Sequence, residues 1–255
     1  MCLVDDPDDR FEFPPAAAGR TRYVHLACTR YLTCMHTGDR SADAIDAGGV
    51  LPGYAGVIVR DGYAGYGHLT DALHAWCGVH LLRDLKGLYD FEPGKQDWAC
   101  RMAGLLIEAR DAASAARCAG QSALGAAVLD DLVTRYRELA TAGLAANLCR
   151  RTATAKDARR LARRFLGFED LILRFAARPD LDIFSNNEAE RTIRPVKVQQ
   201  RTSGGSWRTL DGLAEFALVQ SYLSTAAKWG ISKLDALRDL FHGSAWLPPG
   251  LEPAG

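Results

Sequence analysis

The stretch AGVIVRDGY, residues 55–63, decides the fold, because a compact apolar run in it ends at an aspartate. Short apolar runs bounded by turn residues are typical of buried β-strands. Asp61 follows the run and precedes Gly62, and strand ends are where an α/β sheet presents functional side chains. An aspartate in this position is also typical of a turn. The rest of the chain must therefore decide whether Asp61 has a chemical role.

The segments before this strand predict a hairpin and a short helix. The runs RYVHLAC, residues 22–28, and RYLTCMH, residues 30–36, are rich in β-branched and aromatic residues, which favours two paired strands. The stretch SADAIDAGGVLPGY, residues 41–54, predicts a helix that ends at Gly48 and Gly49. Strands and helices thus alternate in this part of the chain, which indicates an α/β fold.

The segments after the strand change from mixed to helical. Residues 68–91 favour a helix, a short strand near 75–77 and a further helix. From 95 to 178 the apolar residues recur at helical spacing, which predicts an all-helical insertion. Two more amphipathic helices are predicted at 210–230 and 232–243. The predicted parts are an acidic N-terminal segment with a linker (1–20), the first part of a core (21–94), the helical insertion (95–178), a glutamate-bearing helix with the C-terminal helices of the core (179–249), and a tail (250–255).

Composition indicates an ordinary globular protein of a reducing compartment. Of the 255 residues 48% are hydrophobic and 24% are charged, and the formal net charge is zero. Attraction to nucleic acid would therefore require an uneven distribution of charge. The seven cysteines include no CxxC pair, which fits a chain without a disulfide framework. No apolar run reaches the length of a membrane span, so we expect a cytoplasmic protein with no membrane partner.

A second carboxylate of interest lies in the stretch DIFSNNEAERTIRPVKVQQRTSGG, residues 182–205. Carboxylates that come together from distant segments commonly hold a pair of divalent metal ions, and Asp61 and Glu190 suit this arrangement. At helical spacing Glu190 shares a face with Asn186, whereas Glu188 points elsewhere. The cations that follow would bind phosphate, and they are Arg191, Arg194, Lys197 and Arg201. A solvated helix face with alternating charge is the structural alternative.

Four motifs together resemble the transposases of the insertion-sequence-sixty-six (IS-sixty-six) family. The resemblance covers about 22–249, and its motifs are VRDGYAGY, HAWCGVHLLRDL, SNNEAERTIRPVKVQQRTSGG, and SYLSTAAKWGISKLDALRDLF with WLPP. It implies an α/β fold with a ribonuclease-H-like mixed sheet and flanking helices, interrupted by an all-helical insertion. It also implies a DDE-type enzyme that cuts and joins DNA strands with Mg²⁺ or Mn²⁺ in a two-metal site.

The resemblance implies roles for individual carboxylates. Asp61 corresponds to the second aspartate of the triad and Glu190 to its glutamate, whereas Glu188 falls on a variable position of the motif. The first aspartate would be Asp5, which follows a short apolar run and has only four residues before it. The chain therefore resembles an N-terminally truncated copy, and we expect it to show little or no strand transfer by itself. The role of Asn187, in the same motif, stays open.

Three further groups of residues have alternative interpretations. Cys77 and His80 form a CxxH pair that also matches the family motif; a structural zinc site needs four ligands, and a buried thiol beside a histidine is the other interpretation. Trp207 and Tyr222 either stack on bases or pack in the core. A series of cations at helical spacing predicts phosphate contact or a solvated helix face. The series consists of Arg150, Arg151, Lys156, Arg159, Arg160, Arg163 and Arg164, of which Lys156, Arg160 and Arg163 are predicted DNA contacts.

Three functions remain open at this point. The first is a DDE transposase core, which would act on DNA at element ends and target, with a homodimer on DNA as a further expectation. The second is a truncated, inactive remnant that binds DNA without cutting it. The third is a ribonuclease or junction nuclease on the same fold, because fold does not determine function. Asp5 discriminates between the first two, since a site without it lacks one carboxylate.

Overall fold

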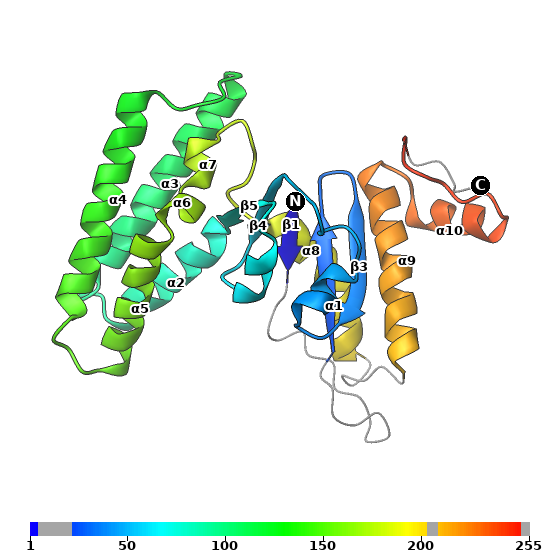
Figure 1. Cartoon of the computed structure of the whole chain (residues 1–255), viewed down its shortest axis with the longest axis horizontal. Coiled ribbons are helices and arrows are strands. Elements are labelled where there is room, and N and C mark those ends of the chain that lie inside the picture. The colour runs from blue at the N-terminus through cyan, green and yellow to red at the C-terminus, as the bar shows by residue number, and fades with distance from the viewer. Residues whose placement is uncertain (5–21, 203–208, 251–255) are drawn as a thin grey trace. The chain divides into compact units, whose positions relative to one another are not determined.

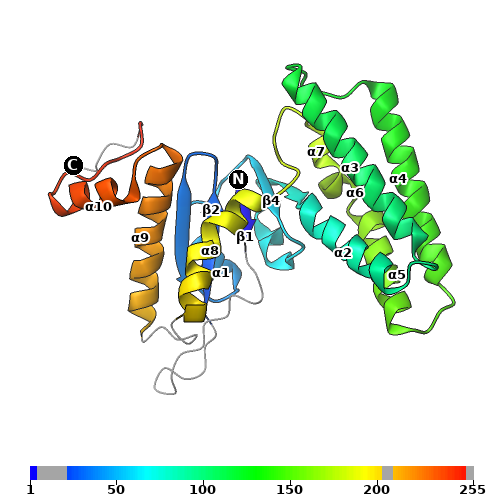
Figure 2. The same cartoon turned by 180° about the vertical axis from the view of Figure 1, so that it is seen from behind.

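The computed structural model describes residues 1–4, 22–202 and 209–250, and the chain divides into two compact units. The first unit consists of Met1–Leu73 and Asn186–Gly255, and the second consists of His74–Ser185. Figures 1 and 2 show the elements of both units, which together make a mixed α/β protein. The second unit contains the whole of the predicted insertion, 95–178, and also the helix that precedes it.

The sheet has five strands in the order β3-β2-β1-β4-β5. The predicted hairpin is confirmed, because β2 pairs with β3 in antiparallel register, with Leu26 opposite Met35. The strand β1 is antiparallel to β2 and parallel to β4, with Cys2 opposite Val59. The sheet is therefore mixed, as the sequence predicts. The strands are β1 (Cys2–Val4), β2 (Tyr23–Cys28), β3 (Thr33–Gly38), β4 (Val57–Arg60) and β5 (Leu73–Trp76).

Both faces of the sheet in the first unit are covered by helices. Because successive side chains of a strand point to opposite faces, Leu26 of β2 packs in a cluster with Ala189 and Leu213, whereas Ala27 packs with Ile45 and Tyr66. Figures 1 and 2 show α1 and α8 on opposite faces of the sheet. The elements involved are α1 (Ala42–Asp46), the 3₁₀-helix η2 (Ala64–His68), α8 (Asn187–Thr202) and α9 (Leu210–Lys228).

The helix α9 protects the edge of the sheet. The strand β3 stands at one end of the strand order, so among the described residues no strand lies beside its outer backbone groups. Side chains from α9 replace that strand: the Thr33 N–H donates to Thr225 Oγ1 (3.1 Å) and the Met35 N–H donates to Ser221 Oγ (2.7 Å). The Thr225 hydroxyl in turn donates to the Thr33 carbonyl (3.3 Å), whereas the single proton of the Ser221 hydroxyl has its closer acceptor in the Ala217 carbonyl of α9 (2.8 Å).

The C-terminal part of the first unit is held by aromatic residues. Gly230, at φ 80°, follows α9, as predicted, and α10 (Lys233–Phe241) comes after it. Tyr222 packs against the cluster of Leu223 and Ala236, and its hydroxyl donates to the Ala236 carbonyl (3.3 Å). Core packing is therefore the role that the structure gives to Tyr222. Trp207, the other residue predicted to stack or pack, lies outside the described residues.

The second unit is helical, as the periodicity of 95–178 predicts. Figures 1 and 2 show α3 and α4 running side by side along the unit. The 3₁₀-helix η2 and the strand β5 precede this unit's helices, and β5 ends at Trp76 because Cys77 serves as the N-cap residue of α2. The helices are α2 (Gly78–Phe91), α3 (Asp97–Cys118), α4 (Ala126–Asn147), α5 (Ala153–Gly167), α6 (Glu169–Ile172) and α7 (Arg174–Ala177).

A buried polar network joins the helices of the second unit. Gln96 and Asn147 are both fully buried and exchange two hydrogen bonds, of 2.8 and 3.0 Å. The Trp98 indole N–H donates to Gln96 Oε1 (2.8 Å), and a Cβ at Gly143 would lie 2.3 Å from the Trp98 ring. The glycine therefore lets α4 approach the indole closely, and each buried amide has the partners that burial requires.

Two stacked histidines lie in the hairpin of the first unit. The rings of His25 and His36 are 4.9 Å apart, and His25 Nε2 is 2.7 Å from the Asp39 carbonyl. The carbonyl can only accept, so the neutral ring carries its proton on Nε2. Burial, and then the neighbouring His36, lowers the pKa of His25 to about 4, although the Asp39 carbonyl opposes this effect. Burial also lowers the pKa of His36. Both rings are therefore neutral in the folded protein near pH 7.

We expect the free energy of unfolding to decrease as the pH falls from 6.5 to about 4. The folded-state pKa of His25 lies below the ordinary value, so the unfolded chain binds more protons in that window and gains stability as the pH falls. The gap from 6.5 to about 4 corresponds to roughly 3 kcal/mol for His25 alone. Urea unfolding curves across the window measure it, and His25→Gln, whose amide can still donate to Asp39, should flatten the dependence. An equal slope in both proteins would contradict the assignment.

Candidate active site

Asp61 stands directly after β4 in a turn that hydrogen bonds hold in place. Its Oδ1 accepts the Tyr63 N–H (2.9 Å), which orients the half-buried carboxylate. The side chain of Arg60 is 6% exposed and donates through Nη1 to the carbonyls of Asp61 (3.3 Å) and Tyr63 (2.7 Å). Asp61 thus stabilises a turn, the structural interpretation considered from the sequence, and it stands directly after the end of β4. Its chemical role stays a prediction.

Glu190 lies in the first turn of α8, which begins at Asn187, within the predicted 185–187. Its N–H donates to the carbonyl of Asn186 (3.1 Å), a residue that is 1% exposed. Ala189 and Ile193 of the same helix are fully buried against the sheet. The half-buried carboxylate of Glu190 is therefore presented from a helix whose rotation about its own axis is determined by packing.

Glu188 has a structural environment of its own. It forms ion pairs with Arg191 (3.1 Å) in α8 and with Lys228 (3.4 Å) at the end of α9. The ammonium group of Lys228, whose side chain is 8% exposed, also donates to the carbonyl of Thr29 (2.6 Å). Glu188 thus helps to attach α9 to α8 and to the hairpin turn.

The structure places Asp61 and Glu190 in the same unit, on elements that both neighbour β1. The strand β4 pairs with β1, and α8 packs against β1 and β2. Asp5, the predicted first aspartate, lies outside the described residues. Among the residues that the structure describes, no group of three or more His, Cys, Asp or Glu side chains could hold a metal ion. The shared metal site of Asp61 and Glu190 therefore stays a prediction.

Comparison with known proteins decides the family. Residues 2–214 match the sequence model of the Transposase IS66 family. The chain belongs to this family. The match confirms the resemblance of the sequence motifs, and it includes the positions of Asp5, Asp61 and Glu190. No curated protein and no solved structure matches the chain.

A hollow in the first unit is lined by neither carboxylate. Its volume is about 700 Å³, and its lining is mostly apolar and includes Leu218 and Val219 of α9 and Val50. Asp61 and Glu190 do not line it. Cavity size alone would favour this apolar hollow as a ligand site. The candidate active site is defined by the positions of the two carboxylates instead.

The cations that follow Glu190 form an exposed stripe along α8. Arg191, Arg194 and Arg201 recur at helical spacing and are exposed, whereas Lys197 is half-buried. Arg191 pairs with Glu188. Within the described part of the chain Arg194 and Arg201 form no ion pair, so their guanidinium groups face solvent uncompensated. This surface suits an anionic partner, and the contact with phosphate stays a prediction.

The basic series near α5 divides into structural and exposed members. From the sequence it has hardly any compensating acid, but the fold supplies partners from α2 and its C-cap residue: Arg150 pairs with Glu92 (2.7 Å), and Arg164 pairs with Asp84 (2.9 Å). Arg159 is half-buried and donates to two backbone carbonyls. The three predicted DNA contacts of this series are all exposed, and they are Lys156, Arg160 and Arg163.

The CxxH pair lies at the start of α2. Cys77 is 1% exposed and serves as the N-cap residue, and His80 follows in the first turn. Among the described residues, Cys77 and His80 belong to no group of three or more His, Cys, Asp or Glu side chains that could hold a metal ion. Asn187 is exposed as the first residue of α8.

Membrane spans are also absent from the described helices: none of them is long and apolar enough to cross a bilayer.

The role of Arg60 was not predicted from the sequence. Its buried guanidinium group supports the turn that carries Asp61, and no pattern near it in the sequence indicates that it is buried.

Proposed function

We propose that the chain is the catalytic core of a DDE transposase, in which Asp61, Glu190 and Asp5 hold Mg²⁺ or Mn²⁺ for cleavage and transfer of DNA strands. The observation that carries the proposal is the pairing of β1 with β4. These strands are parallel neighbours, β1 ends at Val4 and β4 ends at Arg60, so an aspartate follows each of them in the chain. Carboxyl ends of neighbouring parallel strands meet at one edge of a sheet.

The architecture supports a ribonuclease-H-like core. The sheet is mixed, helices cover both of its faces in the first unit, and the helical unit lies in the chain between β4 and α8. Glu190 thus returns to the first unit after the insertion, on a helix that packs against β1. The substrate would be DNA at the ends of the element and at the target, with a homodimer as the acting species.

The donor groups fit a hard divalent cation. Asp61 and Glu190 offer carboxylate oxygens only, which are the ligands that Mg²⁺ and Mn²⁺ prefer. When bound, such ions would activate a water or a 3′-hydroxyl and stabilise the leaving oxygen. The chain itself orients Asp61 through the Tyr63 N–H and holds that turn through Arg60. The exposed arginines of α8 would bind the phosphates on either side of the reacting one.

A crystal soaked in Mn²⁺ tests the proposal directly. The expected result is an anomalous scattering peak bound by Asp61 and Glu190 together with a third carboxylate, and the loss of that peak in Asp61→Asn. Carboxylates that prove to lie on opposite sides of the unit, or a peak that persists in Asp61→Asn, would overturn it. A Mn²⁺ ion bound by Asp61 and Glu190 without a third carboxylate would favour the remnant that binds DNA without cutting it.

We expect DNA binding to depend on the α8 arginines through charge alone. Replacing Arg194 or Arg191 with alanine should weaken binding about equally for all sequences and reduce the salt dependence, log K against log[salt], by about one. Lys197→Ala should act in the same direction. Fluorescence anisotropy over a salt series measures the slope. Arg238→Ala is the matched control, because Arg238 is exposed in the same unit and pairs with Asp235 (3.1 Å). A changed sequence preference would show that these side chains contact bases instead.

A further inference from the structure

A cleft between α2 and α5 of the second unit has no role in the chemistry described above. Its volume is about 490 Å³, within the range of small-ligand sites. Each helix contributes residues at a spacing of three and four, so one face of each helix forms a wall. The lining residues are Arg83, Asp84, Gly87, Leu88 and Phe91 from α2, and Ala153, Thr154, Asp157, Arg160, Leu161 and Arg164 from α5.

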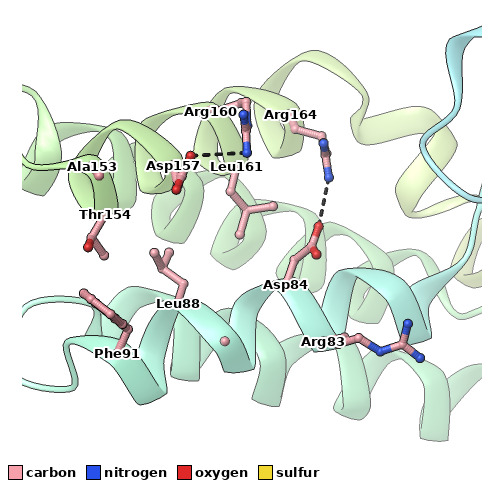
Figure 3. A pocket seen from close by; sticks show the side chains of 11 residues that line it. Arg83, Asp84, Leu88, Phe91, Ala153, Thr154, Asp157, Arg160, Leu161 and Arg164 are labelled. Atoms are coloured by element: carbon pink, nitrogen blue, oxygen red, sulfur yellow. Dashed lines mark hydrogen bonds and ion pairs between the residues drawn. The ribbon is translucent and has the colours of Figure 1, made fainter. Parts of the chain in front are cut away.

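The floor and one end of the cleft are apolar. Leu88 and Leu161 are 8% and 7% exposed, and Figure 3 shows them facing each other from the two helices. Phe91 lies at one end, near Thr154, and the other end is closed by Asp84 and Arg164 (Figure 3). The Phe91 side chain is 74% exposed. A ring this exposed at the mouth of a cleft offers a flat face to a ligand.

The rim of the cleft carries more positive than negative charge. Its two carboxylates are already engaged, because Asp84 pairs with Arg164 (2.9 Å) and Asp157 pairs with Arg160 (3.2 Å). Arg83 is exposed and, in the described part of the chain, forms no ion pair. The Arg160–Asp157 pair is solvent-exposed and spans a single helical turn, so it is weak enough to exchange for a stronger anion. A phosphate therefore meets guanidinium groups at this rim.

Gly87 provides the room. A Cβ built at Gly87 meets no atom within 4 Å, so an added methyl would not clash with the protein. Because Gly87 lines the cleft, the methyl would project into the space that the cleft leaves open. Alanine is also favoured over glycine inside a helix. Gly87→Ala therefore reduces the space for a ligand without weakening the helix.

We propose that this cleft binds one unpaired nucleotide of single-stranded DNA, with the base on the apolar floor beside Phe91 and its phosphate against Arg160 of the opposite wall. The inference rests on the proposed function, which supplies DNA as the partner. A base in a duplex hides both faces in the stack, whereas an unpaired base exposes them to an aromatic ring. The combination of a flat apolar floor, an exposed ring and arginines matches the three parts of a nucleotide.

The test compares single-stranded with double-stranded DNA. Anisotropy of a labelled oligodeoxythymidine and of a blunt duplex of equal length gives the two affinities for the parent chain and its variants. Phe91→Ala should weaken single-strand binding at least about fivefold, because stacking on an aromatic residue contributes that much per base or more. Phe91→Trp should preserve it. Gly87→Ala should weaken it similarly and leave the duplex affinity unchanged.

The control separates occupancy of the cleft from stability of the helix. Gly104 in α3 is also exposed inside a helix, a Cβ there also meets nothing within 4 Å, and it does not line the cleft. Gly104→Ala should leave both affinities unchanged. Gly87→Ala and Gly104→Ala should both melt at or above the melting temperature of the parent chain, since alanine favours the helix over glycine.

Two results would overturn the inference. One is single-strand binding that Gly87→Ala and Phe91→Ala leave intact, and the other is an equal loss for single strand and duplex. Failure of the proposed function looks different: Asp61→Asn would then bind Mn²⁺ and cleave DNA to the same extent as the parent chain. The oligodeoxythymidine assay needs neither metal nor cleavage, so it tests the cleft even in a chain that does not cut DNA.

Discussion

Replacing Asp61 with asparagine should abolish metal-dependent cleavage of a DNA end from the chain's own element. Asparagine keeps the size of the side chain and an oxygen that can accept the Tyr63 N–H, but it removes the charge that a divalent cation requires. Loss of a group that merely supports a metal ligand typically costs about 10- to 100-fold, so loss of the ligand itself should exceed about 100-fold. The measurement is single-turnover cleavage with Mn²⁺, and Glu190→Gln should have the same effect.

The two glutamates of α8 give a matched comparison. Glu188 stands two residues before Glu190 and pairs with Arg191 and Lys228, so Glu188→Gln should affect cleavage far less. Asp61→Asn should still bind DNA, because the phosphate contacts proposed for α8 remain. Full cleavage by Asp61→Asn would refute the assignment of the site. Binding without cleavage by the parent chain would instead favour the remnant that binds DNA without cutting it.

The second large effect concerns the edge of the sheet. The double variant Ser221→Ala with Thr225→Val should lower the free energy of unfolding by roughly 2–6 kcal/mol, because a buried backbone N–H left without an acceptor costs about 1–3 kcal/mol. The two donors are the N–H groups of Thr33 and Met35, residues that are 7% and 4% exposed. Urea unfolding followed by circular dichroism measures the loss. Size-exclusion chromatography should also show self-association, because an unprotected edge can pair with another chain.

A neighbouring serine provides the control for this variant. Ser224 on the same helix contacts the side chain of Thr33 (3.3 Å) rather than the strand backbone. Ser224→Ala should therefore cost much less than the double variant. If the double variant unfolds at the same urea concentration as the parent chain, water replaces the hydroxyls at the edge and α9 does not protect it.

The local structure of the chain could be predicted from short stretches of sequence. The hairpin of residues 22–36 and the strand before Asp61 follow from β-branched, aromatic and apolar runs, and the helices of 95–178 follow from periodicity, because side-chain spacing reports which face of a helix is buried. Gly230 ends α9 as predicted, at a positive φ that glycine adopts without strain. The family and the two carboxylates Asp61 and Glu190 followed from motifs, which the family match confirms for the family itself.

Pairing between distant segments could not be predicted. The sequence shows Arg150 and Arg164 as part of one uncompensated series, and only the fold brings Glu92 and Asp84 to them from α2 and the turn that follows it. The cleft beside Phe91 has the same origin, because neither α2 nor α5 is concave by itself.

The sequence by itself determined most of the secondary structure, the family and the candidate carboxylates, because these depend on residue type and on spacing along one segment. The helix predicted from residue 68 was wrong: the 3₁₀-helix η2 ends at His68 and the strand β5 begins at Leu73. The tertiary structure alone decided which strands are neighbours, so that β1 stands parallel to β4 and each precedes an aspartate. It also decided that hydroxyls of α9 replace a missing strand beside β3. The physical reason is that backbone pairing and burial join residues far apart in the chain, and such contacts leave no periodic signal in either segment.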